Sequence, residues 1–320
     1  MTIETQMKAI VYYEYGSPDV LELRDIDQPT VEDDRVLVRV RAASVNPADW
    51  HMMTGTPIVA RLSEGLFKPK RTVAGADLAG TVEAVGKDVT RFQPGDEVFG
   101  EGSKTFAEYA SVPERLLEHK PANVTFEEAG VVGIAGFTAL QGLRDHGKIQ
   151  SGQHVLINGA SGGVGTFAVQ IAKSFGAEVT AVCSTRNVDM VRSIGADHVI
   201  DYTTEDFTQS GPYDLILDTV GTRPLSQCKQ ALSPEGIYVA VGAPKTMVPL
   251  LGRLLAMAFS KNTVWFVAKA NQEDLVVLRE LLESGAVKPV IDRRYRLSEA
   301  AEAMRYLGEG HAQGKTVITV

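Results

Sequence analysis

Short apolar runs alternate with amphipathic segments through the middle of the chain. Six of these runs have the length and composition of strands, at residues 154–158, 178–183, 198–201, 214–218, 236–241 and 263–267. Continuous apolar runs of this kind are typical of parallel strands that are buried on both faces. Because a full doubly wound sheet has about six strands, the pattern predicts an α/β domain with a parallel sheet.

The first 120 residues follow a different pattern. Short β-like runs at residues 8–13, 35–41 and 79–86 are separated by turns rich in Pro, Gly and Asp, which predicts a β-rich domain. Residues 93–99 read as a tight turn that leads into a further strand. A capping box from Thr125 to Glu128 predicts the first helix of the second domain.

The tail of the chain has elements that the six-strand sheet does not need. We predict a helix over residues 272–284 and strands near residues 287–291 and 316–320. We expect this tail to return to the first domain, which then comprises residues 1–124 and 271–320, whereas residues 125–270 form the second domain. We expect a ligand cleft between the two domains.

A glycine-dense turn connects the first apolar run of the second domain to an amphipathic helix. Glycines let the backbone approach a phosphate closely, and the free N–H groups of a helix N-terminus attract an anion. We interpret the turn as a dinucleotide pyrophosphate site rather than a purely structural turn. Its residues are Gly159, Ala160, Ser161, Gly162, Gly163, Val164 and Gly165.

The end of the second apolar run indicates which dinucleotide binds. NAD sites usually present an acid there to the ribose 2′-OH, but this chain has Ser184, Thr185 and Arg186. Two hydroxyls and a guanidinium suit a 2′-phosphate, so we predict NADPH as the cofactor. The alternative is that Arg186 only caps a solvated loop. Tyr202 is a candidate to flank the adenine, with an ordinary core residue as its alternative.

Composition narrows the possible partners and compartments. The chain has 320 residues, 44% hydrophobic content and a net charge of −8, which suits two globular domains and argues against nucleic acid as a partner. Cys183 and Cys228 cannot form a disulfide framework, and the N-terminus lacks a signal-peptide pattern. We therefore expect a cytoplasmic protein.

One apolar segment, residues 247–259, raises the question of a membrane. It is too short to span a bilayer, which takes about 20 residues. We interpret it as a buried or subunit-facing helix, with a membrane-surface helix as the alternative. Together with the edge strand at residues 263–267, it leads us to expect a homodimer.

Several motifs together resemble one family. The chain is similar to the medium-chain dehydrogenase/reductase superfamily, and within it to the zinc-free quinone oxidoreductase branch. The diagnostic residues are Gly152, Gln153, Leu156, Ala160, Ser161, Gly162, Gly163, Gly165, Gln170 and Lys173. Residues 75–80 and 95–98 resemble a GroES-like catalytic domain, so the resemblance implies such a domain beside a Rossmann domain. Residues 44–49 and 310–315 resemble those of reticulon-interacting mitochondrial oxidoreductases and their bacterial relatives.

The resemblance also implies that no metal is bound. Asn46 stands where the zinc alcohol dehydrogenases of this superfamily have a cysteine ligand, and Ala76 stands where they have a histidine. Two cysteines cannot supply a four-cysteine structural site. Without a Lewis acid, oxidation of simple alcohols is implausible. We therefore expect hydride transfer from NADPH to a quinone or an activated enone.

The resemblance assigns further residues to the site. Asn46 and Thr138 are the candidate catalytic residues; their structural alternatives are an Asx turn before Pro47 and a helix residue bonded to its own backbone. Besides the glycine turn, Ser184, Arg186 and Tyr202, the candidate cofactor contacts are Asn46, Thr138, Val241, Gly242, Phe266 and Lys315. Candidate proton carriers are Asp49, His51 and Lys315, and candidate apolar walls are Trp50, Phe67 and Phe266, for all of which an ordinary structural role is the alternative.

Two other functions remain open at this stage. The superfamily also reduces enoyl thioesters, for which Lys68, Lys70 and Arg71 are a candidate phosphate-binding patch. The second is a non-catalytic scaffold that binds or senses NADPH, since a nucleotide site does not prove chemistry.

Overall fold

The computed structural model describes residues 6–58, 61, 65–242, 262–310 and 312–320. The chain divides into two compact units. The first comprises Met1–Ile134, Ala270–Glu283 and Ile291–Val320, and the second comprises Ala135–Lys269 and Ser284–Val290. The first unit thus includes residues 125–134 and the second includes residues 284–290, which the sequence prediction had assigned the other way round.

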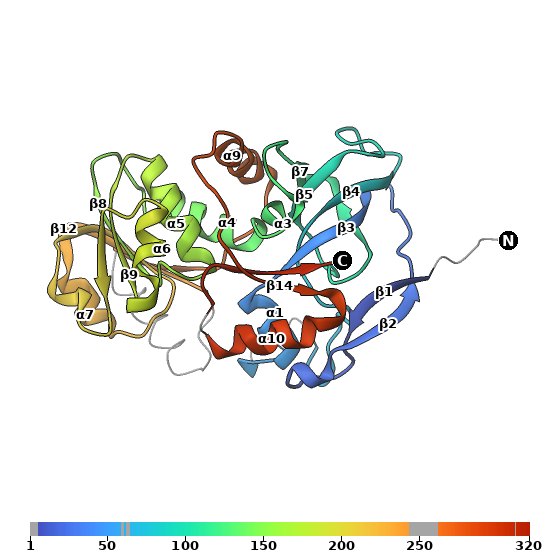
Figure 1. The fold of residues 1–320 in the computed structure, drawn as a ribbon, viewed down its shortest axis with the longest axis horizontal. Coiled ribbons are helices and arrows are strands. Elements are labelled where there is room, and N and C mark those ends of the chain that lie inside the picture. The colour runs from blue at the N-terminus through green and yellow to red at the C-terminus, as the bar shows by residue number, and fades with distance from the viewer. Residues whose placement is uncertain (1–5, 59–60, 62–64, 243–261, 311) are drawn as a thin grey trace. The chain divides into compact units, whose positions relative to one another are not determined.

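The second unit is built on a six-stranded parallel sheet (Figure 1). The strand order is β10-β9-β8-β11-β12-β13, the order of a doubly wound Rossmann sheet. The strands are β8 (His154–Asn158), β9 (Glu178–Cys183), β10 (His198–Asp201), β11 (Tyr213–Asp218), β12 (Leu232–Val241) and β13 (Thr263–Phe266). The apolar runs therefore predicted this sheet correctly.

Helices lie against this sheet in Figure 1. They are α5 (Gly163–Ser174), α6 (Val188–Ser193) and α7 (Leu225–Gln230), with short turns η5 (Thr185–Asn187) and η6 (Phe207–Gln209). Helix α4 (Gly133–Gln141) continues into a π-helical turn, η4 (Gly142–His146). Residues 165–172 of α5 are all buried, so this helix is held against the strands that flank the glycine turn.

The first unit is a mostly antiparallel β structure. Its seven-stranded sheet has the order β14-β15-β3-β4-β5-β7, with β6 paired to β3, and a separate pair is formed by β1 and β2. The strands are β1 (Gln6–Val11), β2 (Glu22–Asp27), β3 (Arg35–Val45), β4 (Asp77–Val85), β5 (Glu97–Glu101), β6 (Tyr109–Pro113), β7 (Leu117–His119), β14 (Ile291–Arg296) and β15 (Lys315–Thr319). This confirms a β-rich domain that the C-terminal tail completes.

Short helices surround the core of this sheet. They are α1 (Pro47–Thr54), α3 (Phe126–Ala129), α9 (Gln272–Glu283) and α10 (Ala300–Glu309), with the turns η1 (Pro18–Val20), η3 (Glu114–Leu116) and η7 (Leu297–Glu299). The core contains aliphatic side chains of β3 and β4 together with Met53 of α1 and Met304 of α10. The C-terminal helix is therefore part of the first unit's core.

The capping box at Thr125 is present, with the Thr125 N–H donating to Glu128 Oε2 over 2.9 Å, and helix α3 begins after it as predicted. This helix is short, ends at Ala129 and lies in the first unit, and α4 begins separately at Gly133. The prediction of a strand near residues 287–291 is wrong. Residues 287–290 do not form a strand, and β14 begins at Ile291. There the Gln170 side-chain amide bonds the N–H and the carbonyl of Lys288, which satisfies the backbone without a neighbouring strand.

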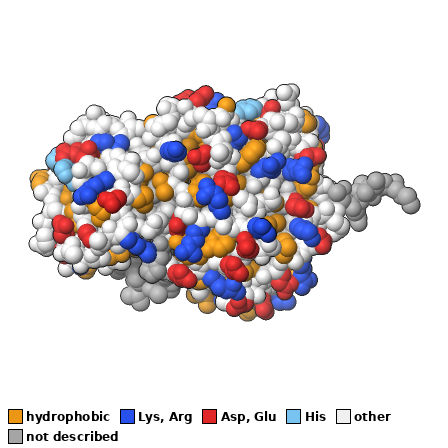
Figure 2. All heavy atoms as spheres, viewed as in Figure 1, with side chains coloured by type: hydrophobic (Ala, Val, Ile, Leu, Met, Phe, Trp, Pro, Cys, Tyr) orange, Lys and Arg blue, Asp and Glu red, His pale blue; other side chains and the backbone are white. Residues whose placement is uncertain are grey.

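No helix among the described residues is long and apolar enough to cross a membrane. The apolar segment 247–259 lies outside the described residues. On the face drawn in Figure 2, Lys and Arg side chains are interspersed with Asp and Glu side chains.

Candidate functional site

The glycine turn follows directly on buried strand β8. Gly159 has a φ of +84°, which favours glycine. Its N–H and that of Ala160 both donate to the carbonyl of Val182, over 3.2 and 3.0 Å, and so tie the turn to strand β9. A Cβ on Gly165 would lie 2.1 Å from the Gly159 carbonyl oxygen. Glycine at 165 therefore lets α5 begin close against the turn.

The start of α5 has the geometry of an anion site. The first hydrogen bond inside the helix runs from the Thr166 N–H to the Gly162 carbonyl, so the three N–H groups before it have no carbonyl partner within the helix. A Cβ on Gly162 would meet only the Gly159 carbonyl oxygen, at 3.4 Å. This leaves room above the turn, and the residues fit a dinucleotide pyrophosphate.

The end of β9 lies beside this turn. Asn187 is buried, and its Nδ2 donates to Ser161 Oγ over 2.9 Å and to Ser184 Oγ over 3.2 Å. The Thr185 hydroxyl donates instead to Asp201, and this bond is the main reason that the pKa of Asp201 is lowered. Of the two hydroxyls that the sequence offered for a 2′-phosphate, only that of Ser184 is therefore turned toward the glycine turn.

Tyr202 and Arg186 are both exposed near the same strand end. The Tyr202 N–H donates to the Cys183 carbonyl over 3.0 Å, and its side chain is 58% exposed. The alternative interpretation of Tyr202 as a core residue is therefore wrong. Arg186 lies in the exposed turn η5.

A buried carboxylate that the sequence analysis did not single out holds the neighbouring loop. Asp218 ends β11 and accepts hydrogen bonds from Asn158 Nδ2 over 2.9 Å and from Tyr238 Oη over 2.6 Å. The N–H groups of Val220 and Gly221 also donate to it. An acid that directly follows an apolar strand is the sequence signal for this role. Asp218 fixes the loop that packs against Gly159.

The first unit contains a separate buried polar cluster. Asp77 is fully buried at the start of β4 and accepts from Ser44 Oγ over 2.6 Å, from Asn46 Nδ2 over 2.9 Å and from the Ile134 N–H over 2.8 Å. Lys315 Nζ lies 3.5 Å from Asp77 Oδ2 and donates to Asn46 Oδ1. The pairing of β15 with β3 brings Lys315 and Asn46 together although 269 positions separate them.

The nitrogen and the oxygen of the Asn46 side-chain amide thus both form hydrogen bonds inside this cluster. The Oδ1 atom accepts from Lys315, and Asn46 is at the same time the N-cap residue of α1. The N–H of Asn46 donates to Asp49 Oδ2 over 2.8 Å at the start of α1. Asn46 therefore links a helix start to a buried ion pair.

Burial dominates the electrostatics of the cluster. Burial, together with the charge of Asp77, raises the pKa of Asp49 to about 7. Burial, followed by the charges of Asp77 and Asp49, raises the pKa of Glu101 to about 8. Burial also lowers the pKa of Lys315, against the opposing effect of Asp77. The cluster therefore holds carboxyl protons near neutral pH.

We expect Asp49 to make the stability of the protein depend on pH. Its pKa is near 7 when folded and 3.8 without burial, so the folded state retains a proton that the unfolded state releases, and stability falls as the pH rises from about 4 to about 7. Asp49→Asn should raise the free energy of unfolding by about 2 to 4 kcal/mol above about pH 8 and by little near about pH 4. Urea unfolding over this pH range measures the difference, and an effect independent of pH would contradict the assignment.

The other predicted site residues lie in one unit or the other. Thr138 and Phe266 of the second unit are buried, and the ring centroids of Phe266 and His146 are 4.2 Å apart. Gly242 follows β12 with a φ of +76°. In the first unit, Trp50 packs against the hydrophobic core, whereas Phe67 is 86% exposed, so a core role for Phe67 is wrong. Convergence of these residues on one nicotinamide stays a prediction.

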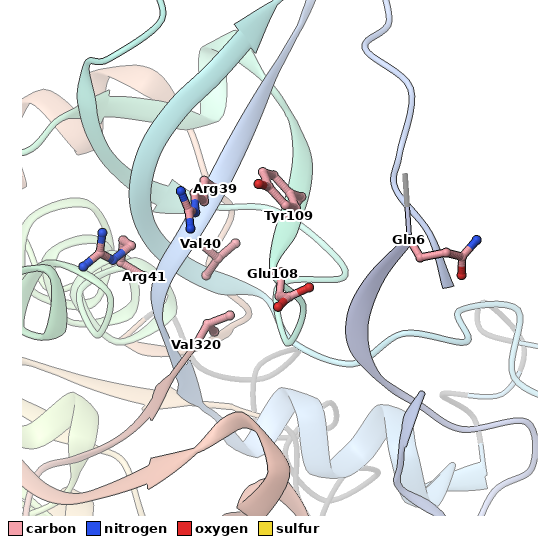
Figure 3. Close-up of a pocket in the computed structure, with 7 residues that line it drawn as sticks. All are labelled: Gln6, Arg39, Val40, Arg41, Glu108, Tyr109 and Val320. Carbon is pink, nitrogen blue, oxygen red and sulfur yellow. The ribbon is translucent and has the colours of Figure 1, made fainter. Parts of the chain in front are cut away.

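A surface groove elsewhere in the first unit contains none of the predicted site residues. Its volume is about 480 Å³, and Figure 3 shows its lining residues, Gln6, Arg39, Val40, Arg41, Glu108, Tyr109 and Val320. Because none of these residues belongs to the glycine turn or to the Lys315 cluster, the groove is not the candidate site.

Comparisons with known proteins identify the family. Residues 32–122 match the alcohol dehydrogenase GroES-like domain, and residues 194–318 match a zinc-binding dehydrogenase domain. The NADPH-dependent alkenal/one oxidoreductase of Arabidopsis thaliana is 36% identical and is aligned over 99% of this chain and 80% of its own length. The mouse NAD(P)H oxidoreductase RTN4IP1 is 34% identical over 99% of this chain and 90% of its own length.

A solved structure supports the same relationship. The quinone oxidoreductase from Coxiella burnetii has a TM-score of 0.87 and 32% identity, and the alignment covers 99% of this chain and all of that one. The chain belongs to the quinone oxidoreductase branch of the medium-chain dehydrogenase/reductase superfamily. In this superfamily member the six-stranded unit is the Rossmann domain, and the antiparallel unit is the GroES-like domain.

The family that matches residues 194–318 is named for zinc binding, so the residues at the expected zinc-ligand positions decide whether this chain could hold the metal. Within the part of the chain that the structure describes, no three His, Cys, Asp or Glu side chains are grouped to hold a metal ion. Asn46 and Ala76 occupy the positions at which the resemblance placed zinc ligands, and the Lys315 ammonium lies against Asn46.

Proposed function

We propose that the protein is an NADPH-dependent reductase that transfers a hydride to a quinone or a conjugated enone without zinc. The observation that carries the proposal is the glycine turn with the free N-terminus of α5, beside a strand end that presents Ser184 and Arg186 and no acid. The Arabidopsis relative is named for NADPH and alkenals or enones, and the Coxiella structure for quinones.

The residues of the Rossmann domain have separate roles in this proposal. The N–H groups at the start of α5 bind the pyrophosphate, Ser184 and Arg186 bind the 2′-phosphate, and the exposed Tyr202 ring covers the adenine. The nicotinamide, when bound, supplies the hydride. Thr138, Asn46 and Lys315 remain our candidates for the residues that hold this end of the cofactor.

The buried cluster supports a reaction that does not use zinc. A neutral amide at position 46 and a methyl group at position 76 are poor zinc ligands. The ammonium of Lys315 lies 3.5 Å from Asp77 Oδ2, and a cation so close would repel a metal ion. Stoichiometric zinc in protein purified without added metal would contradict this part of the proposal.

Electronic structure then decides which acceptors react. An alcohol must lose its hydroxyl proton as the hydride leaves, a step that a metal would assist, whereas a quinone or enone spreads the added charge over a conjugated system. Steady-state assays with NADPH should show turnover with quinones or enones and negligible reaction of NADP with ethanol. Turnover limited to enoyl thioesters, or absent with every acceptor, would overturn the proposal.

We expect Arg186 to determine the preference for NADPH. Arg186→Ala removes a charge-assisted hydrogen bond to the 2′-phosphate, so NADPH binding should weaken by about 1.5 to 3 kcal/mol, with little change for NADH. Fluorescence titration of both cofactors against both proteins measures this. Equal affinities of the unmutated protein for NADPH and NADH would exclude the predicted preference.

A homodimer and a cytoplasmic location complete the proposal. Strand β13 is an edge strand of the described sheet, and pairing with a second copy would satisfy its outer backbone groups. A concentration-independent monomer mass in sedimentation would rule out the dimer, and cell fractionation tests the compartment.

A further inference from the structure

The bridge made by Asn187 links the two segments that approach the cofactor phosphate groups. The turn η5 closes with the Asn187 N–H donating to the Ser184 carbonyl over 2.8 Å. In a 3₁₀ turn, residues three apart lie on the same side, so the Asn187 side chain folds back over Ser184. From there its Nδ2 reaches Ser161 of the glycine turn.

This bridge leaves two hydroxyl protons free to point away from Asn187. A primary amide nitrogen has two hydrogens, and a serine hydroxyl has one hydrogen and two lone pairs. Nδ2 of Asn187 gives one hydrogen bond to each serine oxygen, over 2.9 Å to Ser161 and 3.2 Å to Ser184. Each serine then accepts from the protein interior, and its own hydrogen is left to point outward. Both serines are partly exposed, whereas Asn187 is buried.

We propose that Asn187 is a positioning residue that turns the Ser161 and Ser184 hydroxyls into donors for the 2′-phosphate of NADPH. The inference rests on the proposed function and deepens it, because it names a residue that selects the cofactor without touching it. A phosphate dianion only accepts hydrogen bonds, so two outward hydroxyl donors beside Arg186 suit it. The ribose 2′-OH of NADH is uncharged and can itself donate, so it gains less from these donors.

The acid that bonds η5 is itself held by hydrogen bonds. Asp201 accepts hydrogen bonds from the hydroxyls of Thr185 and Thr203 and from the Thr203 N–H. These donors satisfy its carboxylate on the side of η5. The charged side chain of η5 itself is Arg186, which attracts a phosphate.

Asn187→Asp is the most informative variant because it reverses the hydrogen bonds. A carboxylate has no hydrogen to give, so both serine hydroxyls would turn inward to donate to it, and it would add a negative charge near the phosphate. Asn187→Ala removes the bridge without reversing it. Asn123→Asp, at a residue of the first unit that bonds the Leu282 carbonyl, is the matched control for the substitution.

The experiment compares two nucleotides that differ only in the group concerned, adenosine 2′,5′-bisphosphate and 5′-AMP, by calorimetric titration. For the bisphosphate, Asn187→Asp should weaken binding by at least about 30-fold and Asn187→Ala by about tenfold, whereas 5′-AMP should change by less than about threefold. In a Ser184→Ala background, the effect of Asn187→Ala should shrink, because one of the two hydroxyls that it positions is gone.

The outcomes separate the inference from the proposed function. If the unmutated protein does not prefer the bisphosphate, NADPH is the wrong cofactor and both fail. If the preference is present but Asn187→Asp leaves it unchanged, or weakens both nucleotides equally, only the role of Asn187 is overturned. Should Asn187→Asp fail to fold, the Asn187→Ala and Ser184→Ala cycle decides, with additive effects contradicting the inference.

Discussion

Replacing Lys315 by methionine should lower the free energy of unfolding by about 3 to 5 kcal/mol near pH 7, because it leaves Asp77 buried without its cation. Asp77 is fully buried, and Lys315 is nearly so. The loss should shrink below about pH 7, where Asp49 retains its proton and the cluster carries less negative charge. Chemical denaturation of the variant and the unmutated protein at several pH values measures both effects.

Two control variants show whether burial is the cause. Lys173 bonds Asp197 over 2.7 Å with about a third of its side chain exposed, so Lys173→Met should cost about 1 kcal/mol or less. Adding Asp77→Asn to Lys315→Met should recover part of the stability, because the unpaired buried charge is removed. Equal losses for Lys315→Met and Lys173→Met would contradict our account of the cluster.

Gly165→Ala should abolish most NADPH binding. The added Cβ would lie 2.1 Å from the Gly159 carbonyl oxygen and 2.7 Å from the Ala160 Cα, both backbone atoms that cannot move without opening the turn. We expect a loss of about 1 to 3 kcal/mol in stability and a loss in NADPH affinity on the order of 100-fold. Isothermal titration and thermal unfolding measure the two effects.

Gly162→Ala tests whether a methyl group that the folded chain tolerates still blocks NADPH binding. Its Cβ would meet only the Gly159 carbonyl oxygen, at 3.4 Å, and its φ of −83° suits alanine. Stability should therefore change little, whereas NADPH binding should weaken by about tenfold or more because the methyl group fills the room above the turn. Unchanged NADPH binding in both glycine variants would exclude this turn as the cofactor site.

The local parts of the fold were predictable from sequence. Strands β8, β9 and β10 begin and end at the predicted residues, because a strand that is buried on both faces is a continuous apolar run between turns. The strand predicted near residues 287–291 was wrong, because the Gln170 side chain, 118 positions away, satisfies the backbone of Lys288. A contact of that kind leaves no periodic signal.

The chemistry was predictable only where the sequence itself brings residues together. The glycine turn and Ser184 follow consecutive strands of one βαβ unit, so their proximity was foreseeable. The hydrogen bond that Asn46 Oδ1 accepts from Lys315 was not foreseeable, because it depends on the pairing of β15 with β3. The contacts of Asn187 with Ser161 and Ser184 were also missed, because they depend on which way a side chain folds over a short turn.

Deuterium transfer tests the central claim most directly. NADPH that carries deuterium at the reactive nicotinamide carbon, in the position that the enzyme transfers, is incubated with a conjugated enone and metal-free protein, and the product is analysed by mass spectrometry and NMR. We predict one deuterium at the β-carbon of the saturated ketone and the same yield with a chelator present. Undeuterated product formed from either stereoisomer of the labelled cofactor, no product with any quinone or enone, or activity lost on chelation would contradict the account.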